Sequence, residues 1–279
     1  EWYDKYQISM IDGMTVDLIE PEAYQIRLAN GQSLNYDKLI LATGAAPRML
    51  PQVADLENVR VLRSVDDAAA LRRAMQTASS VVVIGGGYIG LEAAASFSKA
   101  GLNVHLVEAA QRLLARVASP DMSAFFHGLH KRHGVMIYTG MNKTKFHQKD
   151  GLFTGITLDT GKKILAELLV VGIGVVPESA LADAIGAETG NGILVDRHMR
   201  TTIEDIYAIG DVALVEGAAL RVESVHNAQD TAVRAAADIA KTPLPDISIP
   251  WFWSEQYDVK LQSAGIVPAG KDDMRYAVR

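Results

Sequence analysis

Short aliphatic runs alternate along the chain with longer Ala-rich, amphipathic stretches, and glycine or proline separates most of them. Such short apolar runs predict buried strands, and the amphipathic stretches predict helices. Alternation of the two through short glycine connections indicates an α/β fold with parallel sheets. The predicted strands cover residues 15–19, 23–28, 36–43, 81–84, 104–107, 135–138, 143–148, 155–158, 168–172, 206–209 and 276–278, and the predicted helices cover 64–78, 87–100, 120–133 and 224–240.

Terminal signals support three of these helices. Ser64 or Asp66 can cap the first, and Gly101 is placed to end the helix that precedes it. Ser119 followed by Pro120 predicts the start of the third helix.

The most informative local pattern is a strand of four aliphatic residues that breaks into glycines and opens a helix, in the string VVVIGGGYIGLE from residue 81. Gly85 allows a tight turn, Gly87 lets the backbone approach a pyrophosphate, and Gly90 permits close contact between helix and strand. The phosphates are then expected at the positive helix N-terminus, beside the backbone of Tyr88 and Ile89. This pattern predicts a dinucleotide-binding unit.

The next predicted strand ends on an acid, Glu108. A carboxylate there accepts a hydrogen bond from the 2′-hydroxyl of the adenosine ribose and repels a 2′-phosphate, so NAD is favoured over NADP. Arg112 lies nearby in sequence and reduces that preference.

Composition restricts the chemistry. The 279 residues carry a net charge of −6, which gives no global attraction to nucleic acid or to an anionic membrane. No cysteine is present, which excludes a redox dithiol, and any electron chemistry must use a bound cofactor. The longest apolar stretch is broken by Gly172 and Gly174, and no signal peptide pattern opens the chain, so a cytoplasmic protein is expected.

Three histidines, His127, His130 and His133, recur at a spacing of three on one predicted helix. This spacing drifts around the helix, so the three rings cannot converge on one metal ion. We therefore predict a solvated helix face and no metal site.

Several longer strings carry a resemblance. TTIEDIYAIGDVA, LILATGAAPR and VVGIGVVPESALA, together with the glycine unit, resemble the flavin-dependent pyridine nucleotide oxidoreductases. RVESVHNAQDTA and PWFWSEQYDVKLQSAG are similar to the ferredoxin reductase group, which includes the putidaredoxin and rhodocoxin reductases.

The resemblance implies two doubly wound, Rossmann-like domains. An incomplete FAD-binding domain is expected at 1–46 and 168–250, an NAD-binding domain at 47–167, and the start of a C-terminal domain at 251–279. The family begins with an FAD-binding βαβ unit that carries its own glycine fingerprint. Because this unit is not found here, we expect a chain truncated at both ends that holds FAD weakly.

For the flavin, the resemblance implies that Asp211 binds the ribityl hydroxyl and that the backbone of Val225 contacts the isoalloxazine edge. Thr43 and Gly44 would line the crossover between domains, and Val16 would touch the adenine through its backbone. A turn aspartate is the simpler interpretation of Asp211.

Further residues are implied around the two rings. Arg63 would bind the FAD side, Trp253 would lie against the flavin, and Glu92 would sit beside the nicotinamide. The segment Gly172, Ile173 and Gly174 would follow the nicotinamide half of NAD. Simpler interpretations remain open: a solvated arginine, a core or interface tryptophan, and a glutamate that favours the first turn of its helix.

The implied function is NADH-dependent reduction of a [2Fe-2S] ferredoxin of a monooxygenase system through FAD. One alternative is a catalytically silent NAD-binding module. Another is a flavoprotein reductase with a different acceptor, such as a quinone, which the absence of cysteine and the PWFWS string disfavour.

Overall fold

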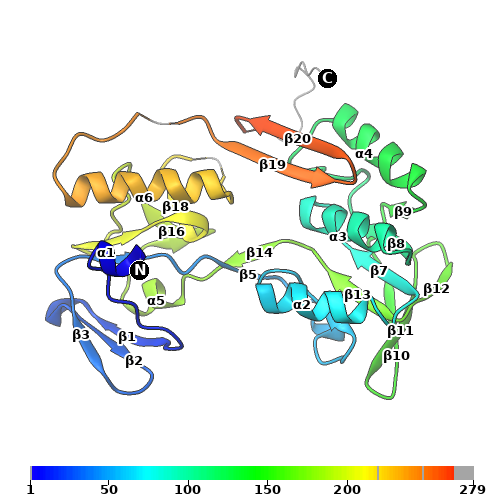
Figure 1. Ribbon diagram of the computed structural model, residues 1–279, viewed down its shortest axis with the longest axis horizontal. Coiled ribbons are helices and arrows are strands. Elements are labelled where there is room, and N and C mark those ends of the chain that lie inside the picture. Colours follow the sequence, from blue (N-terminus) through cyan, green and yellow to red (C-terminus); the bar gives the residue numbers. More distant parts are fainter. Residues whose placement is uncertain (1, 219, 247, 267–279) are drawn as a thin grey trace. The chain divides into compact units, whose positions relative to one another are not determined.

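The computed structural model describes residues 2–218, 220–246 and 248–266, and its helices and strands are labelled in Figure 1. The chain divides into two compact units. Unit 1 comprises Glu1–Ala45 and Pro177–Ser248, and unit 2 comprises Ala46–Val176 and Ile249–Arg279. The predicted strand at 276–278 lies outside the described residues.

Unit 2 is built on a parallel sheet of five strands in the order β6-β13-β7-β8-β9. Chain order runs outward from β7 through β8 to β9 and then returns to β13 on the other side of β7. The strand order therefore reverses between β7 and β13, which is where open α/β sheets bind ligands. The strands are β6 Val59–Arg60, β7 Ser80–Ile84, β8 Asn103–Glu108, β9 Met136–Thr139 and β13 Leu168–Val171.

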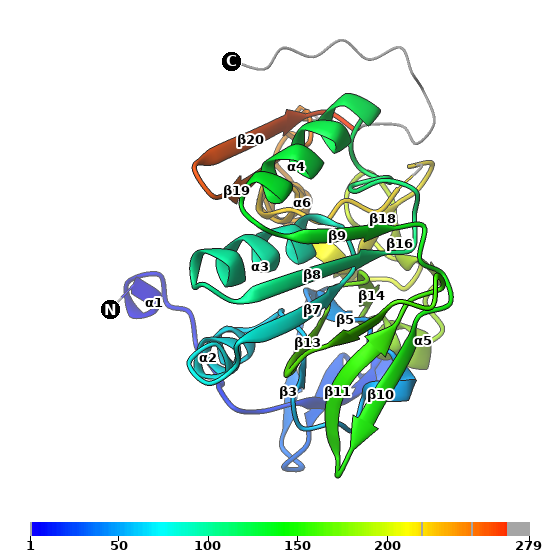
Figure 2. The same cartoon turned by 90° about the vertical axis from the view of Figure 1, so that its right-hand side faces the viewer.

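Different elements cover the two faces of this sheet (Figure 2). Val81 and Val83 of β7 face a core shared with helices, whereas Val82 faces a core shared with an antiparallel meander. Alternation along the strand sends neighbouring side chains to opposite faces. The helices are α2 Val65–Ala74, α3 Tyr88–Lys99 and α4 Pro120–Arg132, and the meander strands are β10 Lys145–Lys149, β11 Leu152–Thr157 and β12 Lys163–Leu165.

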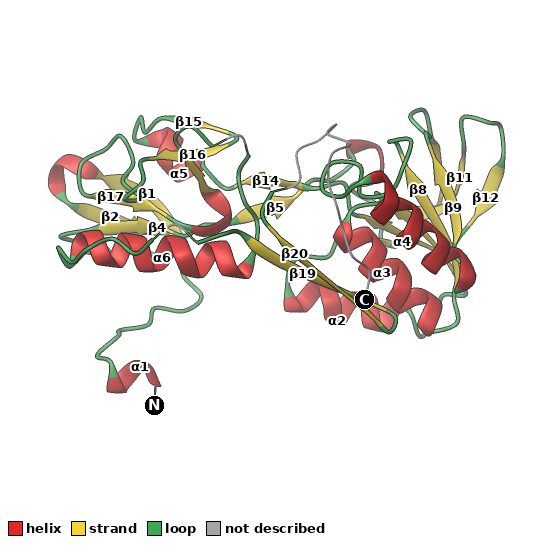
Figure 3. Ribbon diagram, turned by 90° about the horizontal axis from the view of Figure 1, so that it is seen from above, coloured by secondary structure: helices red, strands yellow, loops and turns green. Residues whose placement is uncertain are grey.

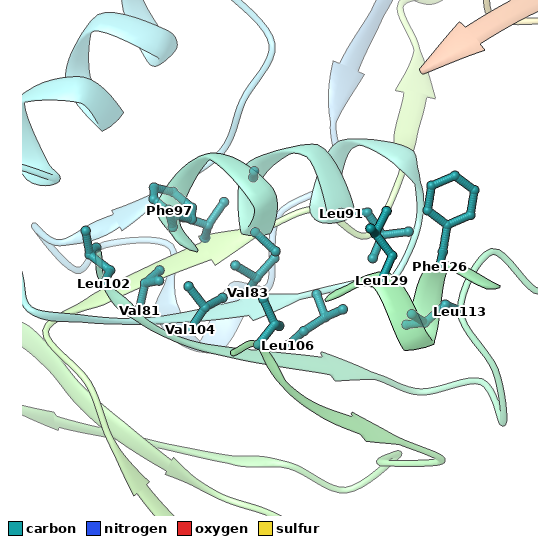
Figure 4. Close-up of a cluster of buried hydrophobic side chains, with 14 of the residues drawn as sticks. Val81, Val83, Leu91, Phe97, Leu102, Val104, Leu106, Leu113, Phe126 and Leu129 are labelled. Carbon is teal, nitrogen blue, oxygen red and sulfur yellow. The ribbon is translucent and has the colours of Figure 1, made fainter. Parts of the chain in front are cut away.

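The helix-side core is where α3 is held against the sheet. Figure 4 shows Leu91 and Phe97 of α3 lying over side chains of β7 and β8, including Val83 and Leu106. Leu91 and Leu106 are fully buried. Each fully buried side chain of this size contributes about 1.5–3 kcal/mol, so the position of α3 on the sheet is well determined.

A hairpin of β19 Trp251–Gln256 and β20 Val259–Ala264 also belongs to unit 2. It lies beside α3 and α4 (Figure 1). The rings of Tyr88 and Phe252 lie 4.4 Å apart, and Leu261 packs on the helix-side core. The expectation that residue 251 opens a further domain stays a prediction.

Unit 1 combines an antiparallel meander of β1, β2 and β3 with two parallel strand pairs, β4 with β17 and β16 with β18. Helix α6 packs its buried Ala235 on the core formed by these strands (Figure 3). Its main elements are β1 Val16–Glu20, β2 Gln25–Leu28, β3 Ser33–Asn35, β4 Leu39–Leu41, β15 Thr189–Gly190, β16 Gly192–Val195, β17 Ile206–Ala208, β18 Ala213–Val215, α1 Trp2–Lys5, α5 Ala180–Ala184 and α6 Val225–Ile239.

Three short one-turn helices and one strand pair complete the described part of the fold. On the segments that connect the units, β5 Ala45–Pro47 pairs with β14 Val175–Pro177. The short helices are η1 Pro21–Ala23, η2 Pro51–Val53 and η3 Gly210–Val212.

The α/β class predicted from the sequence is confirmed, with two differences in detail. The predicted strand at 36–43 is limited to Leu39–Leu41. The boundary expected at residue 168 is misplaced, because β13 pairs with β7 and so places 168–176 in unit 2. The apolar sequence of a strand does not indicate which sheet the strand joins. In the described part of the chain, none of the helices combines the length and the apolar composition needed to cross a bilayer.

Candidate functional site

The turn between β7 and α3 is packed so tightly that two of its glycines cannot carry a side chain. Gly85 has φ of +108°, and a Cβ there would lie 2.2 Å from the carbonyl oxygen of Gly172. A Cβ on Gly90 would lie 2.0 Å from the carbonyl oxygen of Gly85. The backbone at the end of β7 therefore lies close to the start of α3 and to the end of β13, and glycine makes this close approach possible.

Gly87 differs from both neighbours. It is the N-cap of α3, with φ of −80°, and a Cβ there would meet no atom within 4 Å. No side chain caps this helix, so its first amides, which include those of Tyr88 and Ile89, are not engaged by a side-chain cap. Helix amides and the positive end of the helix dipole favour an anion at such a place.

Glu108 ends β8 at the same edge of the sheet. Its Oε2 accepts from the backbone N–H of Gly86 at 2.5 Å, and its Oε1 accepts from the backbone N–H of Ala110 at 2.7 Å. A Cβ on Gly86 would lie 2.7 Å from Cδ2 of Leu113 and 3.0 Å from Oε2 of Glu108. Glycine at position 86 therefore leaves room for the side chains of Leu113 and Glu108, although the sequence pattern did not single it out. Its signal was the run of three consecutive glycines, of which Gly86 is the second.

The segment that follows β13 completes this edge. The N–H of Gly172 donates to the carbonyl of Ile84 at 2.8 Å, and Ile173 packs on the meander-side core. Gly174 has φ of +98°, and Nη2 of Arg116 lies 3.5 Å from the position of its Cβ. Arg116 brings a cation to the end of β13, and sequence reasoning missed it because nothing in the sequence pairs it with Gly174.

Arg112 is held by its own loop. Its Nη1 donates to the carbonyl of Ala118 at 2.8 Å and to Oγ of Ser123 at 2.6 Å, and its Nη2 donates to the carbonyl of Ala115 at 3.1 Å. These bonds direct the guanidinium donors into the loop between β8 and α4.

Glu92 and Trp253, the two residues expected at the reacting rings, are brought into one neighbourhood of unit 2. Oγ of Ser254 donates to Oε1 of Glu92 at 2.5 Å. Burial raises the pKa of the Glu92 carboxyl, and the hydrogen bond from Ser254 opposes that rise. Trp253 points to the other face of β19, where it is 38% exposed and stacks on Trp251 with ring centroids 5.1 Å apart.

In unit 1, Asp211 and Val225 lie at contacting elements, η3 and the start of α6. The N–H of Gly210 donates to Oγ1 of Thr231 at 2.9 Å, which joins the turn to the helix. Asp211 is half-buried, its backbone carbonyl accepts from the Arg221 guanidinium, and Val225 is exposed.

Three other predicted residues also belong to unit 1. Oγ1 of Thr43 donates to the carbonyl of Glu178 at 2.6 Å, and Gly44 has φ of +72°. Val16 begins β1 and is partly buried. Arg63, expected on the FAD side, is an exposed residue of unit 2, and its backbone N–H donates to Oδ2 of Asp67.

The histidines of α4 correct one expectation. His130 is fully buried rather than solvated, because the β19–β20 hairpin covers that face of α4. His127 is half-buried and His133 is exposed. Over the described residues, no group of three His, Cys, Asp or Glu side chains is arranged to hold a metal ion.

Comparison with known proteins places this geometry in a family. The profile described as pyridine nucleotide-disulphide oxidoreductase matches residues 4–232. Rhodocoxin reductase of Rhodococcus erythropolis is 43% identical over 277 residues, covering 98% of this chain and 65% of that protein. Putidaredoxin reductase CamA of Pseudomonas putida is 38% identical over 274 residues, covering 95% and 65%. The chain thus spans 65% of the length of these curated relatives.

Solved structures agree with this placement. The crystal structure of the covalent putidaredoxin reductase–putidaredoxin complex matches with a TM-score of 0.91 at 38% identity, covering 95% of this chain and 66% of that chain. The ferredoxin reductase for the CYP199A2 system from Rhodopseudomonas palustris matches with a TM-score of 0.90 at 40% identity, covering 95% and 67%.

Proposed function

Because this chain belongs to the pyridine nucleotide-disulphide oxidoreductase family, we propose that it is the nucleotide-binding part of a flavoprotein reductase. The reductase takes electrons from NADH and passes them through FAD to a [2Fe-2S] ferredoxin of a monooxygenase system. The observation that carries this proposal is the uncapped N-terminus of α3, which lies beside Glu108 where the strand order of unit 2 reverses.

The residues at this edge fit NAD. The pyrophosphate would take the open space over Gly87, where the amides of Tyr88 and Ile89 could donate to it. Gly172, Ile173 and Gly174 would follow the nicotinamide half, and Arg116 would add a positive charge beside Gly174. A carboxylate has about four acceptor sites, so Glu108 can accept from ribose hydroxyls besides its two backbone partners.

Two charged side chains support NADH over NADPH. The carboxylate of Glu108 repels a 2′-phosphate. Arg112, the cation that lowered this preference on sequence grounds, donates instead to Ala115, Ala118 and Ser123.

Unit 1 supplies most of the flavin contacts that we propose, whereas Arg63 and Trp253 belong to unit 2. Asp211 is at a turn that α6 supports, where its carboxylate can accept from two ribityl hydroxyls. The backbone of Val225 begins α6 and would contact the isoalloxazine edge. Thr43 and Gly44 would line the crossover between domains, and the backbone of Val16 would touch the adenine. Arg63 is proposed for the FAD side as well.

Bound NADH and FAD supply hydride transfer and the division of an electron pair into single electrons for the ferredoxin. We propose that Glu92 lies beside the nicotinamide and that Trp253 lies against the flavin. The ferredoxin acceptor is proposed from the names of the relatives and from the solved reductase–putidaredoxin complex.

The test is stopped-flow absorbance with the chain in the presence of saturating FAD, because we expect the chain to hold FAD weakly. NADH should bleach the flavin first, and an added [2Fe-2S] ferredoxin should then be reduced. Trp253→Ala should slow the second step more than the first, whereas the control Trp2→Ala should slow neither. A chain that binds FAD and NADH yet reduces no ferredoxin contradicts the proposal. Equal loss of both steps in Trp253→Ala overturns the role of that tryptophan.

A further inference from the structure

A continuous chain of hydrogen bonds crosses unit 2 from α3 through the hairpin to α4. Ser254 bonds Glu92 at 2.5 Å, and Nε2 of Gln256 bonds Oγ of Ser254 at 3.0 Å. Oε1 of Gln256 lies 2.8 Å from Nε2 of His130. The hydroxyl of Tyr257 lies 3.2 Å from Nδ1 of the same ring. The chain thus ties together residues far apart in sequence.

The direction of every bond in this chain follows from the ionised carboxylate of Glu92 at its α3 end. An ionised carboxylate only accepts, so the hydroxyl of Ser254 donates to Glu92 and its oxygen accepts from Gln256. The amide nitrogen of Gln256 is thereby used as a donor, and its oxygen must accept from His130. His130 therefore carries its proton on Nε2, and its bare Nδ1 accepts from the hydroxyl of Tyr257.

The surroundings favour this protonation pattern. His130, Ser254 and Gln256 are each at most 1% exposed, so each polar atom depends on its partner in the chain. Burial lowers the pKa of His130, which favours the neutral ring, and burial raises the pKa of Tyr257, which keeps its hydroxyl a donor. Among the described residues, the other titratable groups nearby are Glu255 beside Glu92, His127 and His133 beside His130, and Lys99, whose Nζ lies 5.9 Å from the centre of the Tyr257 ring.

We propose that Ser254, Gln256 and neutral, Nε2-protonated His130 are positioning residues that hold Glu92 as an oriented carboxylate and lock the hairpin onto α3. The importance of Glu92 for turnover rests on the proposed function, whereas the hydrogen-bond order does not. A shift of the hairpin would break the hydrogen bond between Ser254 and Glu92. This bond therefore fixes the position of Ser254, and with it the neighbouring Trp253, relative to the carboxylate of Glu92 on α3.

The first test reads the His130 ring directly. Two-bond proton–nitrogen NMR of the whole chain separates the two neutral tautomers from the imidazolium, and the spectrum of His130→Gln assigns the signals. We expect a single Nε2-protonated form at neutral pH. An Nδ1-protonated ring, or an imidazolium at that pH, overturns the proposal. This measurement on the unaltered chain does not depend on whether a variant folds.

The second test asks whether a change at His130 reaches Glu92. Carbon-13 NMR titration of the Glu92 carboxyl should show a pKa raised by about one unit in Ser254→Ala, which loses the direct donor. His130→Leu, which leaves Gln256 without its donor, should raise it in the same direction by a smaller amount. His130→Gln keeps an N–H group near the Nε2 position, so the pKa of Glu92 should return most of the way to its value in the unaltered chain.

The matched control is His127→Gln, on the same helix but outside the chain of bonds. If the substitutions act only through a general change in packing, the pKa of Glu92 will shift equally in both His130 variants and in the control. That result would overturn the proposal. These readouts need neither flavin nor turnover, so they can fail while the proposed function holds. In the FAD-loaded chain, His130→Leu should lower the rate of flavin reduction more than it raises the KM for NADH.

Discussion

The two longer helices that begin near the proposed cofactor positions, α3 in unit 2 and α6 in unit 1, start in opposite ways. Helix α6 has a side-chain cap, because Oγ of Ser224 accepts from the N–H of Asn227 at 3.1 Å. Helix α3 has a glycine in that place and no side-chain cap. A folded chain normally satisfies its first helical amides, so the uncapped start of α3 is consistent with the anion position that we propose there.

The same contrast holds against the other long helices of unit 2. Ser64 forms a capping box with Asp67 at the start of α2, and Ser119 caps α4. Only α3, among the described helices of ten or more residues, lacks a side-chain cap. We expect the capped starts to contribute stability and the uncapped start of α3 to contribute binding. The following substitutions separate these two contributions.

Gly90→Ala should have the largest effect. Its Cβ would lie 2.0 Å from the carbonyl oxygen of Gly85, so the backbone must move, and the free energy of unfolding should fall by about 3 kcal/mol. Chemical denaturation followed by circular dichroism measures this change. The control Gly128→Ala in α4 meets nothing closer than 3.4 Å and should leave stability equal or higher. Equal stability of the two variants would show that α3 does not need its close approach to β7.

Glu108→Ala should weaken NADH binding by about 1–3 kcal/mol, because a ribose hydroxyl loses its acceptor. It should also reduce the difference between the affinities for NADH and NADPH. The substitution also removes the acceptor of the Gly86 and Ala110 amides, so unit 2 should melt at a lower temperature. Calorimetric titration with each nucleotide, below the melting temperature, separates the two effects. If the unaltered chain binds NADPH as tightly as NADH, the proposed role of Glu108 is wrong.

Gly87→Ala should separate binding from stability. Its φ of −80° suits alanine and no atom lies within 4 Å of the new Cβ, so the free energy of unfolding should stay equal or rise by about 0.4–1 kcal/mol. The methyl group would occupy the space proposed for the pyrophosphate, and NADH affinity should fall roughly tenfold, about 1.4 kcal/mol. Unchanged NADH affinity would show that the phosphates do not bind at this helix end.

Ser224→Ala should have the smallest effect and the opposite signature. Loss of the cap should lower the free energy of unfolding by about 1 kcal/mol, and NADH affinity should not change. Denaturation and calorimetric titration of the same sample check both. A large loss of NADH binding would mean that the two helix ends do not divide the roles as proposed.

Local signals predicted most elements of the fold. The helix at 120–133 was found as Pro120–Arg132 with Ser119 as its cap, since capping and periodicity depend on residues close in sequence. The strand at 36–43 was overestimated, because only Leu39–Leu41 finds a partner strand in β17. Pairing depends on residues far along the chain, and a local pattern does not report it.

The glycine unit and Glu108 could be found from the sequence because their spacing reflects one strand, one turn and one helix. The buried state of His130 and its bond to Gln256 could not, because that contact joins residues 126 positions apart. Arg116 near Gly174 and the division of the chain at β13 depend in the same way on long-range packing. The sequence alone determined the class of cofactor, through short-range sterics and charge. Tertiary structure decided which side chains meet, because the side chains of α3, α4 and the hairpin approach one another only after their apolar faces are buried together.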